Sequence, residues 1–168
     1  CILLSILKEL TTSVGIGIDI SKKAVQTAIF NAKKLNLSKR ACFKIFDISK
    51  FSSGEYDLIV SNPPYIPSKD LKNLSKDITD YEPLGALNGG IDGLDLMKKV
   101  IYKSNKLLKK SGIFALEIGN RQYFEVSRIL KKNGFGELGK VYDYKENVRC
   151  IISTKLDNYL IYFDKWKL

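Results

Sequence analysis

The chain has 168 residues, 45% of them hydrophobic, and a formal net charge of +10 from 28 basic and 18 acidic residues. This length predicts one domain with its own core, and no apolar run approaches the roughly 18 residues of a membrane span. The absence of histidine excludes His-based triads and His metal sites. Three cysteines without a CxxC pair, Cys1, Cys42 and Cys150, argue against disulfides and zinc. With no recognisable signal peptide, we expect a cytoplasmic protein without metal or membrane contact.

The first third of the chain predicts two helices and two strands. Apolar spacing predicts a helix over 1–10, a short buried strand over 14–20 and a helix over 22–36 that Ser21 caps. A further strand over 41–46 ends at Asp47. The side of the second helix that faces the core is expected to consist of six apolar residues: Ala24, Val25, Ala28, Ile29, Ala32 and Leu35.

The rest of the chain continues the alternation of strand and helix. We expect a buried strand over 56–61, a long polar connection over 67–93 and a helix over 94–110. Asp92 or Gly93 is expected to begin this helix and Gly112 to end it. Its apolar positions at helical spacing are Leu94, Met97, Ile101 and Leu108. A strand over 113–118, a helix over 121–132 and an antiparallel pair over 137–142 and 148–154 follow. This order predicts an α/β fold with a mostly parallel sheet, helices on both faces and a C-terminal antiparallel hairpin.

The positive charge is compatible with nucleic-acid binding, but we interpret it as a solvated surface. Only four of the 28 basic residues are arginines, and the lysines are spread along helix faces. An acidic or ribosome-associated partner stays open.

The tetrapeptide Asn62-Pro63-Pro64-Tyr65 directly follows the strand over 56–61. Ligands of open α/β sheets bind beyond the carboxyl ends of the strands, so this turn is a candidate active site. The prolines make it stiff. Because they carry no N–H, the loop offers mainly acceptors: the side-chain oxygen of Asn62 and the backbone oxygens of Asn62 and Pro63.

Such a loop suits a planar –NH2 group. Two carbonyls can accept both of its hydrogens, while Tyr65 supplies a flat surface for the amide or base that carries it. Methyl transfer from a sulfonium needs mostly in-line positioning, with the reacting atoms roughly 3–3.5 Å apart, and carbonyl dipoles stabilise the positive charge on the nitrogen. We therefore predict Asn62, Pro63, Pro64 and Tyr65 as catalytic residues. The alternative is a loop that only ends a strand.

Carboxylates stand at the ends of two consecutive strands, at Asp19 and Asp47. In a nucleotide-binding fold the first could accept both ribose hydroxyls. The second could accept from an adenine amino group, with Ile48 against the ring. Asp also ends strands and caps helices by propensity alone, and this alternative stays open.

Several segments together resemble a known family. They are the Asp19 strand end, Asp47, the tetrapeptide, Tyr81 to Leu87 with Gly89 to Gly93, Leu116 to Gly119, and Asp143-Tyr144 with Asn147-Val148-Arg149. Up to about Thr154 the chain resembles the peptide-chain release factor N5-glutamine methyltransferases. DNA adenine and ribosomal RNA guanine methyltransferases share the tetrapeptide, whereas the block EPL-x-AL-x-GG-x-DG over 82–93 is typical of the glutamine enzymes.

The resemblance implies a Rossmann-like class I S-adenosylmethionine-dependent methyltransferase. Its substrate would be the side-chain amide of the glutamine in a Gly-Gly-Gln motif of release factors, which are then the protein partners. Asn62, Pro63, Pro64 and Tyr65 would bind this substrate. The cofactor, S-adenosylmethionine, would lie against Asp19, Asp47, Ile48 and Asn62.

One departure from the family is large. Its glycine-rich cofactor loop precedes the first helix, and this chain begins at Cys1, already in that helix. We expect a sequence cut short upstream, with the first strand absent, a partial catalytic domain over 1–154 and a tail over 155–168. Such a chain is expected to bind the cofactor poorly and to expose sheet surface.

Two other functions remain open. An RNA or DNA amino-methyltransferase would use the same tetrapeptide, and the basic charge favours it. A non-catalytic remnant would keep the fold as a protein-binding domain.

Overall fold

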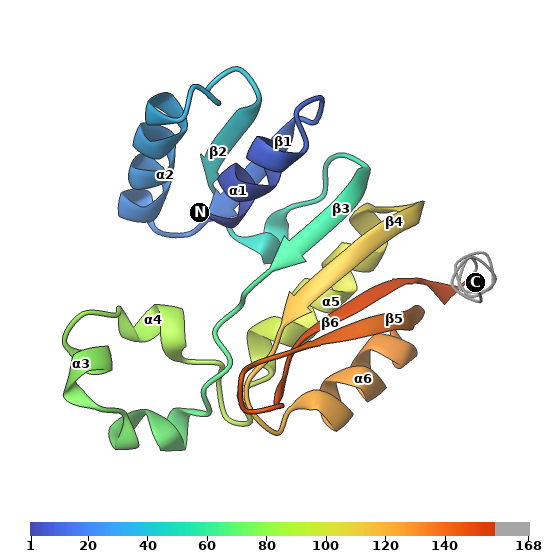
Figure 1. Cartoon of the computed structure of the whole chain (residues 1–168). Coiled ribbons are helices and arrows are strands. Elements are labelled where there is room, and N and C mark those ends of the chain that lie inside the picture. The colour runs from blue at the N-terminus through green and yellow to red at the C-terminus, as the bar shows by residue number, and fades with distance from the viewer. Residues whose placement is uncertain (157–168) are drawn as a thin grey trace. The chain divides into compact units, whose positions relative to one another are not determined.

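The computed structural model describes residues 1–156, which divide into two compact units, Cys1–Phe51 and the chain from Ser52 onward (Figure 1). Each unit combines parallel strands with helices. The tail expected over 155–168 lies beyond the described residues, apart from Lys155 and Leu156.

The first unit is a two-stranded parallel sheet with two helices. Its elements are α1 (Ile2–Glu9), β1 (Gly15–Asp19), α2 (Lys22–Lys34), β2 (Ala41–Ile45) and a 3-10 turn, η1 (Ile48–Lys50). The strands run in register from Gly15 beside Ala41 to Asp19 beside Ile45. Its core cluster consists of Leu4, Leu7, Ala32 and Leu37.

Side chains hydrogen-bond to the backbone at the N-terminus of α2 and at the C-terminus of α1. Ser21 caps α2 as expected, because its Oγ accepts the N–H of Ala24 at 3.2 Å. The Arg40 guanidinium donates to carbonyls at the end of α1, including that of Leu7 at 2.7 Å. The last carbonyls of a helix have no partner within the helix, so Arg40 ties the end of α1 to the start of β2.

Two expectations for this unit were wrong. Of the six residues expected to face the core from the second helix, Val25 and Ala32 are buried, whereas Ile29 is 40% and Leu35 47% exposed. β1 is only partly buried rather than buried. A sheet of two strands offers little area to cover, which accounts for both differences.

The second unit contains a four-stranded mixed sheet. Its strands are β3 (Tyr56–Ser61), β4 (Leu108–Glu117), β5 (Phe135–Tyr142) and β6 (Val148–Lys155), in the spatial order β3-β4-β6-β5. β3 and β4 are parallel, and β6 is antiparallel to both β4 and β5. The expected parallel pairs and the C-terminal hairpin are therefore present, and in the described residues parallel and antiparallel pairings are equal in number.

Helices α5 (Asp95–Leu107) and α6 (Tyr123–Lys132) cover one face of this sheet. α5 packs against β3 and β4, α6 packs against β5 and β6, and the two helices contact each other. Helices on both faces were expected, but within this unit the long helices share a face. The core between them and the sheet includes Met97, Ile101, Phe114, Val126 and Ile151, all fully buried.

The segment before β4 differs from the expectation. α5 ends at Leu107 rather than near Gly112, and β4 begins at Leu108 rather than at residue 113. The register shifts between Tyr56 beside Leu108 and Leu58 beside Ile113. The Lys109 ammonium lies 2.9 Å from the Asp57 carboxylate on the neighbouring strand, so a lysine-rich stretch that looks helical is held in the sheet.

One further expectation was wrong. β3 was expected to be buried, but it has a ladder partner on one side only within the described residues, and Leu58 and Val60 are 38% and 37% exposed. The long polar connection expected over 67–93 carries short helical elements. It contains η2 (Ser68–Asn73), α3 (Lys76–Thr79) and α4 (Leu84–Leu87), drawn in green in Figure 1. None of the helices within residues 1–156 has the length and apolar character needed to cross a membrane.

Candidate functional site

The tetrapeptide forms one wall of a pocket at the carboxyl end of β3. The pocket has a volume of about 360 Å³. It is lined by Asn62, Pro63, Pro64, Tyr65, Ile66, Glu82, Ala86 and Leu87. Pro63 is buried and Asn62 is exposed. No hydrogen bond within residues 1–156 involves the Asn62 side-chain amide, so its oxygen is available to a ligand.

The second wall comes from the block over 82–93, and backbone hydrogen bonds join it to the first. The N–H of Ile66 donates to the carbonyl of Leu87 at 3.0 Å, and the N–H of Gly89 donates to the carbonyl of Ile66 at 2.8 Å. Beyond them the N–H of Ser68 donates to the carbonyl of Gly90 at 2.8 Å. These hydrogen bonds fix the register between the two segments. The block over 82–93 therefore supports the segment that directly follows the tetrapeptide.

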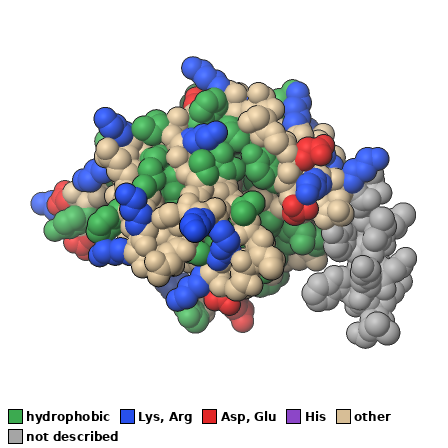
Figure 2. Space-filling view, turned by 90° about the horizontal axis from the view of Figure 1, so that it is seen from above, with side chains coloured by type: hydrophobic (Ala, Val, Ile, Leu, Met, Phe, Trp, Pro, Cys, Tyr) green, Lys and Arg blue, Asp and Glu red, His purple; other side chains and the backbone are tan. Residues whose placement is uncertain are grey.

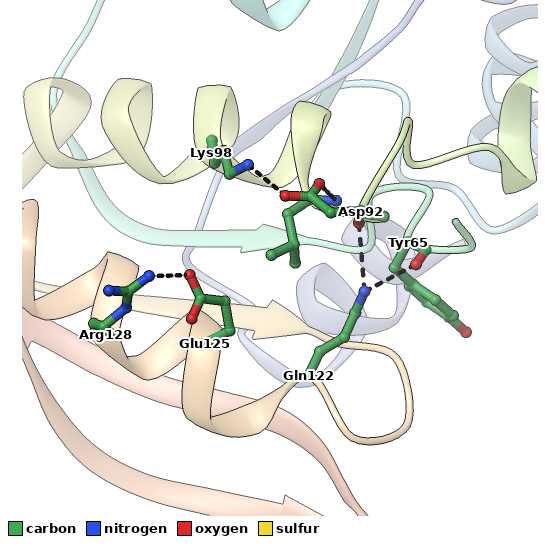
Figure 3. Close-up of polar contacts among 8 residues, drawn as sticks. Tyr65, Asp92, Lys98, Gln122, Glu125 and Arg128 are labelled. Carbon is green, nitrogen blue, oxygen red and sulfur yellow. Dashed lines mark hydrogen bonds and ion pairs between the residues drawn. The ribbon is translucent and has the colours of Figure 1, made fainter. Parts of the chain in front are cut away.

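Gln122, just before α6, fastens the end of the tetrapeptide to two other loops (Figure 3). Its Nε2 donates to the carbonyl of Tyr65 at 2.9 Å and reaches that of Gly93 at 3.5 Å. Its Oε1 accepts the N–H of Gly119, which follows β4, at 2.8 Å. One amide thus satisfies groups from three segments. The sequence analysis missed Gln122, because its partner Tyr65 lies 57 residues away in the chain.

Gly93 sits where only glycine fits. Its φ is +78°, and an added Cβ would collide with the backbone carbonyl of Tyr65 and lie 2.8 Å from Nε2 of Gln122. The neighbouring Asp92 carboxylate accepts the N–H of Leu94 at 2.9 Å and forms an ion pair with Lys98 at 2.7 Å (Figure 3). The hydrogen bond from Lys98 is the main reason why the pKa of Asp92 is lowered. Asp92 therefore stabilises the start of α5, and Gly93 allows the chain there to pass close to Tyr65 of the tetrapeptide.

The ring of Tyr65 is anchored by Arg149 of β6. Nη2 of Arg149 donates to the Tyr65 hydroxyl at 2.9 Å, and the guanidinium carbon lies 5.4 Å from the ring centroid. Arg149 also lies 3.5 Å from a carboxylate oxygen of Glu117 on β4. The hydroxyl and face of Tyr65 are thus fixed from the sheet, which suits a ring that must present a flat surface.

Asp143 and Asn147, which carry part of the family resemblance, build the hairpin turn before Arg149. Oδ1 of Asp143 accepts the backbone N–H groups of Lys145 at 2.8 Å and Asn147 at 3.0 Å. The bond from Asn147 is the largest cause of the lowered pKa of Asp143. This turn sets the start of β6 and hence the position of Arg149.

The predicted cofactor residues of the first unit lie at one edge of its sheet. Asp19 ends β1, and Asp47 follows β2. Oδ1 of Asp19 accepts the N–H of Ser21 at 2.7 Å, and Oδ1 of Asp47 accepts the N–H of Ser49 at 2.8 Å. Asp47 therefore caps η1, whereas Asp19 accepts the N–H of Ser21, the residue that caps α2. Both carboxylates remain exposed, and Ile48 is partly buried beside them.

Removing the polar groups of Gln122 is expected to loosen the loop that carries Tyr65. We expect Gln122→Met, which keeps the length of the side chain, to lower the free energy of unfolding by about 1–3 kcal/mol, because the partly buried Tyr65 carbonyl and Gly119 N–H lose their partner. Gln122→Glu keeps the acceptor for Gly119 and should lose less. Urea denaturation measures both, and equal stability of the Met variant and the unaltered protein would contradict this role.

The chain belongs to the methyltransferase domain family, whose model matches residues 2–159. This class of enzyme takes its methyl group from S-adenosylmethionine. Among its relatives are the release factor glutamine methyltransferases of Rhodospirillum rubrum, 37% identical over 92% of this chain and 48% of the relative, and of Fusobacterium nucleatum, 40% identical over 90% and 43%. These relatives confirm the resemblance read from the sequence. The chain spans about half the length of the curated relatives it matches.

Solved structures confirm the fold. TrmN from Thermus thermophilus superimposes with a TM-score of 0.62 at 23% identity over 91% of this chain and 40% of that chain. Magnesium protoporphyrin IX methyltransferase from Synechocystis, solved with bound S-adenosylmethionine, gives a TM-score of 0.56 at 17% identity over 87% and 61%. Within residues 1–156 no group of three or more His, Cys, Asp and Glu side chains could hold a metal ion.

Proposed function

We propose that the protein transfers a methyl group from S-adenosylmethionine to the side-chain amide of the glutamine in the Gly-Gly-Gln motif of peptide-chain release factors. The observation that carries this proposal is the pocket at Asn62, where an unpaired side-chain amide and two prolines without N–H groups leave mainly acceptors. The names of the curated relatives support the choice of substrate.

The pocket residues would act by holding the amide nitrogen. The Asn62 oxygen and a backbone carbonyl of the tetrapeptide would accept the two N–H hydrogens of the glutamine, which points the nitrogen's remaining face outward for an in-line transfer. The same dipoles would stabilise the positive charge that the nitrogen gains. The ring of Tyr65, fixed by Arg149, would lie against the planar amide.

The first unit carries the groups that would hold the cofactor, which supplies an electrophilic methyl group on a sulfonium. Asp19 and Asp47 fit such a role, because both exposed carboxylates follow adjacent parallel strands at the same sheet edge. We assign the ribose hydroxyls to Asp19, the adenine amino group to Asp47 and the ring face to Ile48.

Methylation of a nucleic-acid base is the second candidate. The tetrapeptide and the net charge of +10 favour it. Figure 2 nevertheless shows Lys and Arg side chains as separate groups among apolar and uncharged ones on the face it draws. The segment over 68–93, which supplies the second wall of the pocket, carries three lysines and five carboxylates. A negative balance beside the pocket disfavours phosphates.

Methyl incorporation from labelled S-adenosylmethionine distinguishes these functions. We expect label in a release factor, none in its variant with alanine in place of the Gly-Gly-Gln glutamine, and none in RNA. Label in RNA but not in the release factor would contradict the proposal, and no label in any substrate would favour the non-catalytic remnant. A cytoplasmic location, with release factors either free or on the ribosome as partners, follows from this substrate.

A further inference from the structure

Among residues 1–156, Glu82 is the only charged one that lines the pocket. It lies between the short helices α3 and α4, where its N–H donates to the carbonyl of Ile78 at 2.9 Å. Pro83 follows it and fixes the entry into α4. Within residues 1–156 no ion pair involves the Glu82 carboxylate. Glu82 is exposed, so a solvated carboxylate, unpaired within the described residues, belongs to a residue that lines the same pocket as Asn62.

Like this carboxylate, the backbone around the pocket offers few hydrogen-bond donors. Pro63 and Pro64 have no N–H, and the N–H of Ile66 is already used by the carbonyl of Leu87. A ligand that fills this space must therefore bring N–H groups of its own. A glutamine amide brings two, and the peptide backbone around it brings more.

The charge near the pocket points to the same class of ligand. The chain is strongly basic, but residues 68–93 are net acidic. Their lysines are Lys69, Lys72 and Lys76, and their carboxylates are Asp70, Asp77, Asp80, Glu82 and Asp92. A single strand of nucleic acid carries a negative charge at every nucleotide, and its affinity for a protein comes largely from Lys and Arg side chains that contact the phosphates. A carboxylate in the pocket wall opposes such a ligand and attracts N–H donors.

We propose that Glu82 determines substrate specificity: its carboxylate accepts backbone N–H groups of the peptide that carries the target glutamine, and it excludes nucleic acid from the pocket. Glycines beside the glutamine suit this contact, because without side chains their N–H groups can approach a carboxylate closely. This inference rests on the proposed function and names the residue that selects its substrate class.

Binding titrations test the inference without requiring turnover. The probes are a labelled peptide with the Gly-Gly-Gln motif, the same peptide with alanine in place of glutamine, and a short single-stranded RNA. Glu82→Gln removes the charge and keeps the shape, and Glu82→Lys reverses the charge. Asp77→Asn and Asp77→Lys are matched controls, because Asp77 lies in α3 of the same acidic segment and does not line the pocket. Circular dichroism checks that each variant is folded.

We expect Glu82→Gln to weaken peptide binding roughly fivefold, the difference between a charge-assisted and a neutral hydrogen bond. Glu82→Lys should weaken peptide binding further and strengthen RNA binding. The Asp77 variants should leave the preference for peptide over RNA within about twofold, since surface charges contribute little individually.

The outcomes separate this inference from the proposed function. If the unaltered protein prefers the glutamine peptide and the Glu82 variants match the Asp77 variants, the role of Glu82 is wrong and the proposed function stands. If the unaltered protein binds RNA in preference to the peptide, or does not distinguish glutamine from alanine, both are wrong.

Discussion

Asn62→Ala is expected to lower kcat/KM for release factor methylation on the order of 10²- to 10³-fold, the usual cost of losing one oriented group that stabilises transition-state charge. The free energy of unfolding should change by less than about 0.5 kcal/mol, because the side chain is exposed and has no hydrogen bond within the described residues. Affinity for S-adenosylmethionine should stay close to that of the unaltered protein, since the lost acceptor serves the amide of the substrate.

Two further variants sharpen this result. Asn62→Asp keeps an oxygen acceptor at the same position and should retain more activity than Asn62→Ala. Asn73→Ala, another exposed asparagine on the connection after the tetrapeptide, should leave turnover unchanged. An Asn62→Ala enzyme as active as Asn73→Ala would show that the Asn62 oxygen does not hold the reacting nitrogen.

Gly93→Ala is expected to have the largest effect on stability, lowering the free energy of unfolding by about 2–4 kcal/mol. An alanine at φ +78° is strained, and its Cβ would collide with the Tyr65 carbonyl and lie 2.8 Å from Nε2 of Gln122. Both of these groups hold the tetrapeptide in place. Relief of the collision requires the backbone at Tyr65 to move, so peptide affinity should fall with stability.

The matched control for this substitution is Gly85→Ala in α4. A Cβ there meets nothing within 4 Å, and Gly85 has no positive φ. Because alanine favours a helix over glycine by up to about 1 kcal/mol, Gly85→Ala should be neutral or slightly stabilising. Urea denaturation of both variants measures the difference, and equal stability would mean that Gly93 is not constrained by Tyr65.

The order of elements could be predicted because it depends on local chemistry. Ser21 caps α2 as expected, Gly134 at φ +78° follows the helix expected over 121–132, and a turn that includes Asn147 joins the two strands of the expected hairpin. The start of β4 could not be predicted. Lys109 and Lys110 continue a helical pattern, and their place in the sheet depends on pairing with β3, 52 residues earlier in the case of Asp57.

The substrate wall of the site could be predicted in part for a similar reason. The stiffness and acceptor character of Asn62 to Tyr65 follow from proline chemistry and need no partner. The groups that hold Tyr65 could not be predicted as such, because Gln122 and Arg149 lie 57 and 84 residues away in the chain. Arg149 is among the residues that carry the family resemblance, but the resemblance did not indicate that it contacts Tyr65.

The cofactor residues remain predictions. In the structure Asp19 ends β1 and Asp47 follows the neighbouring parallel strand β2, and each has a local hydrogen bond that would account for an aspartate there. An aspartate is expected after a strand both when it only forms a turn or caps a helix and when it binds a cofactor. The sequence pattern alone therefore could not distinguish these two roles.

The most direct test of the proposed activity is tandem mass spectrometry of a release factor after incubation with the protein and S-adenosylmethionine. The proposed role of the Asn62 pocket predicts a single methyl group on the side-chain amide nitrogen of the Gly-Gly-Gln glutamine, formed on the order of 10²- to 10³-fold more slowly after Asn62→Ala. A methyl group on any other atom of the release factor, or on RNA alone, would contradict it.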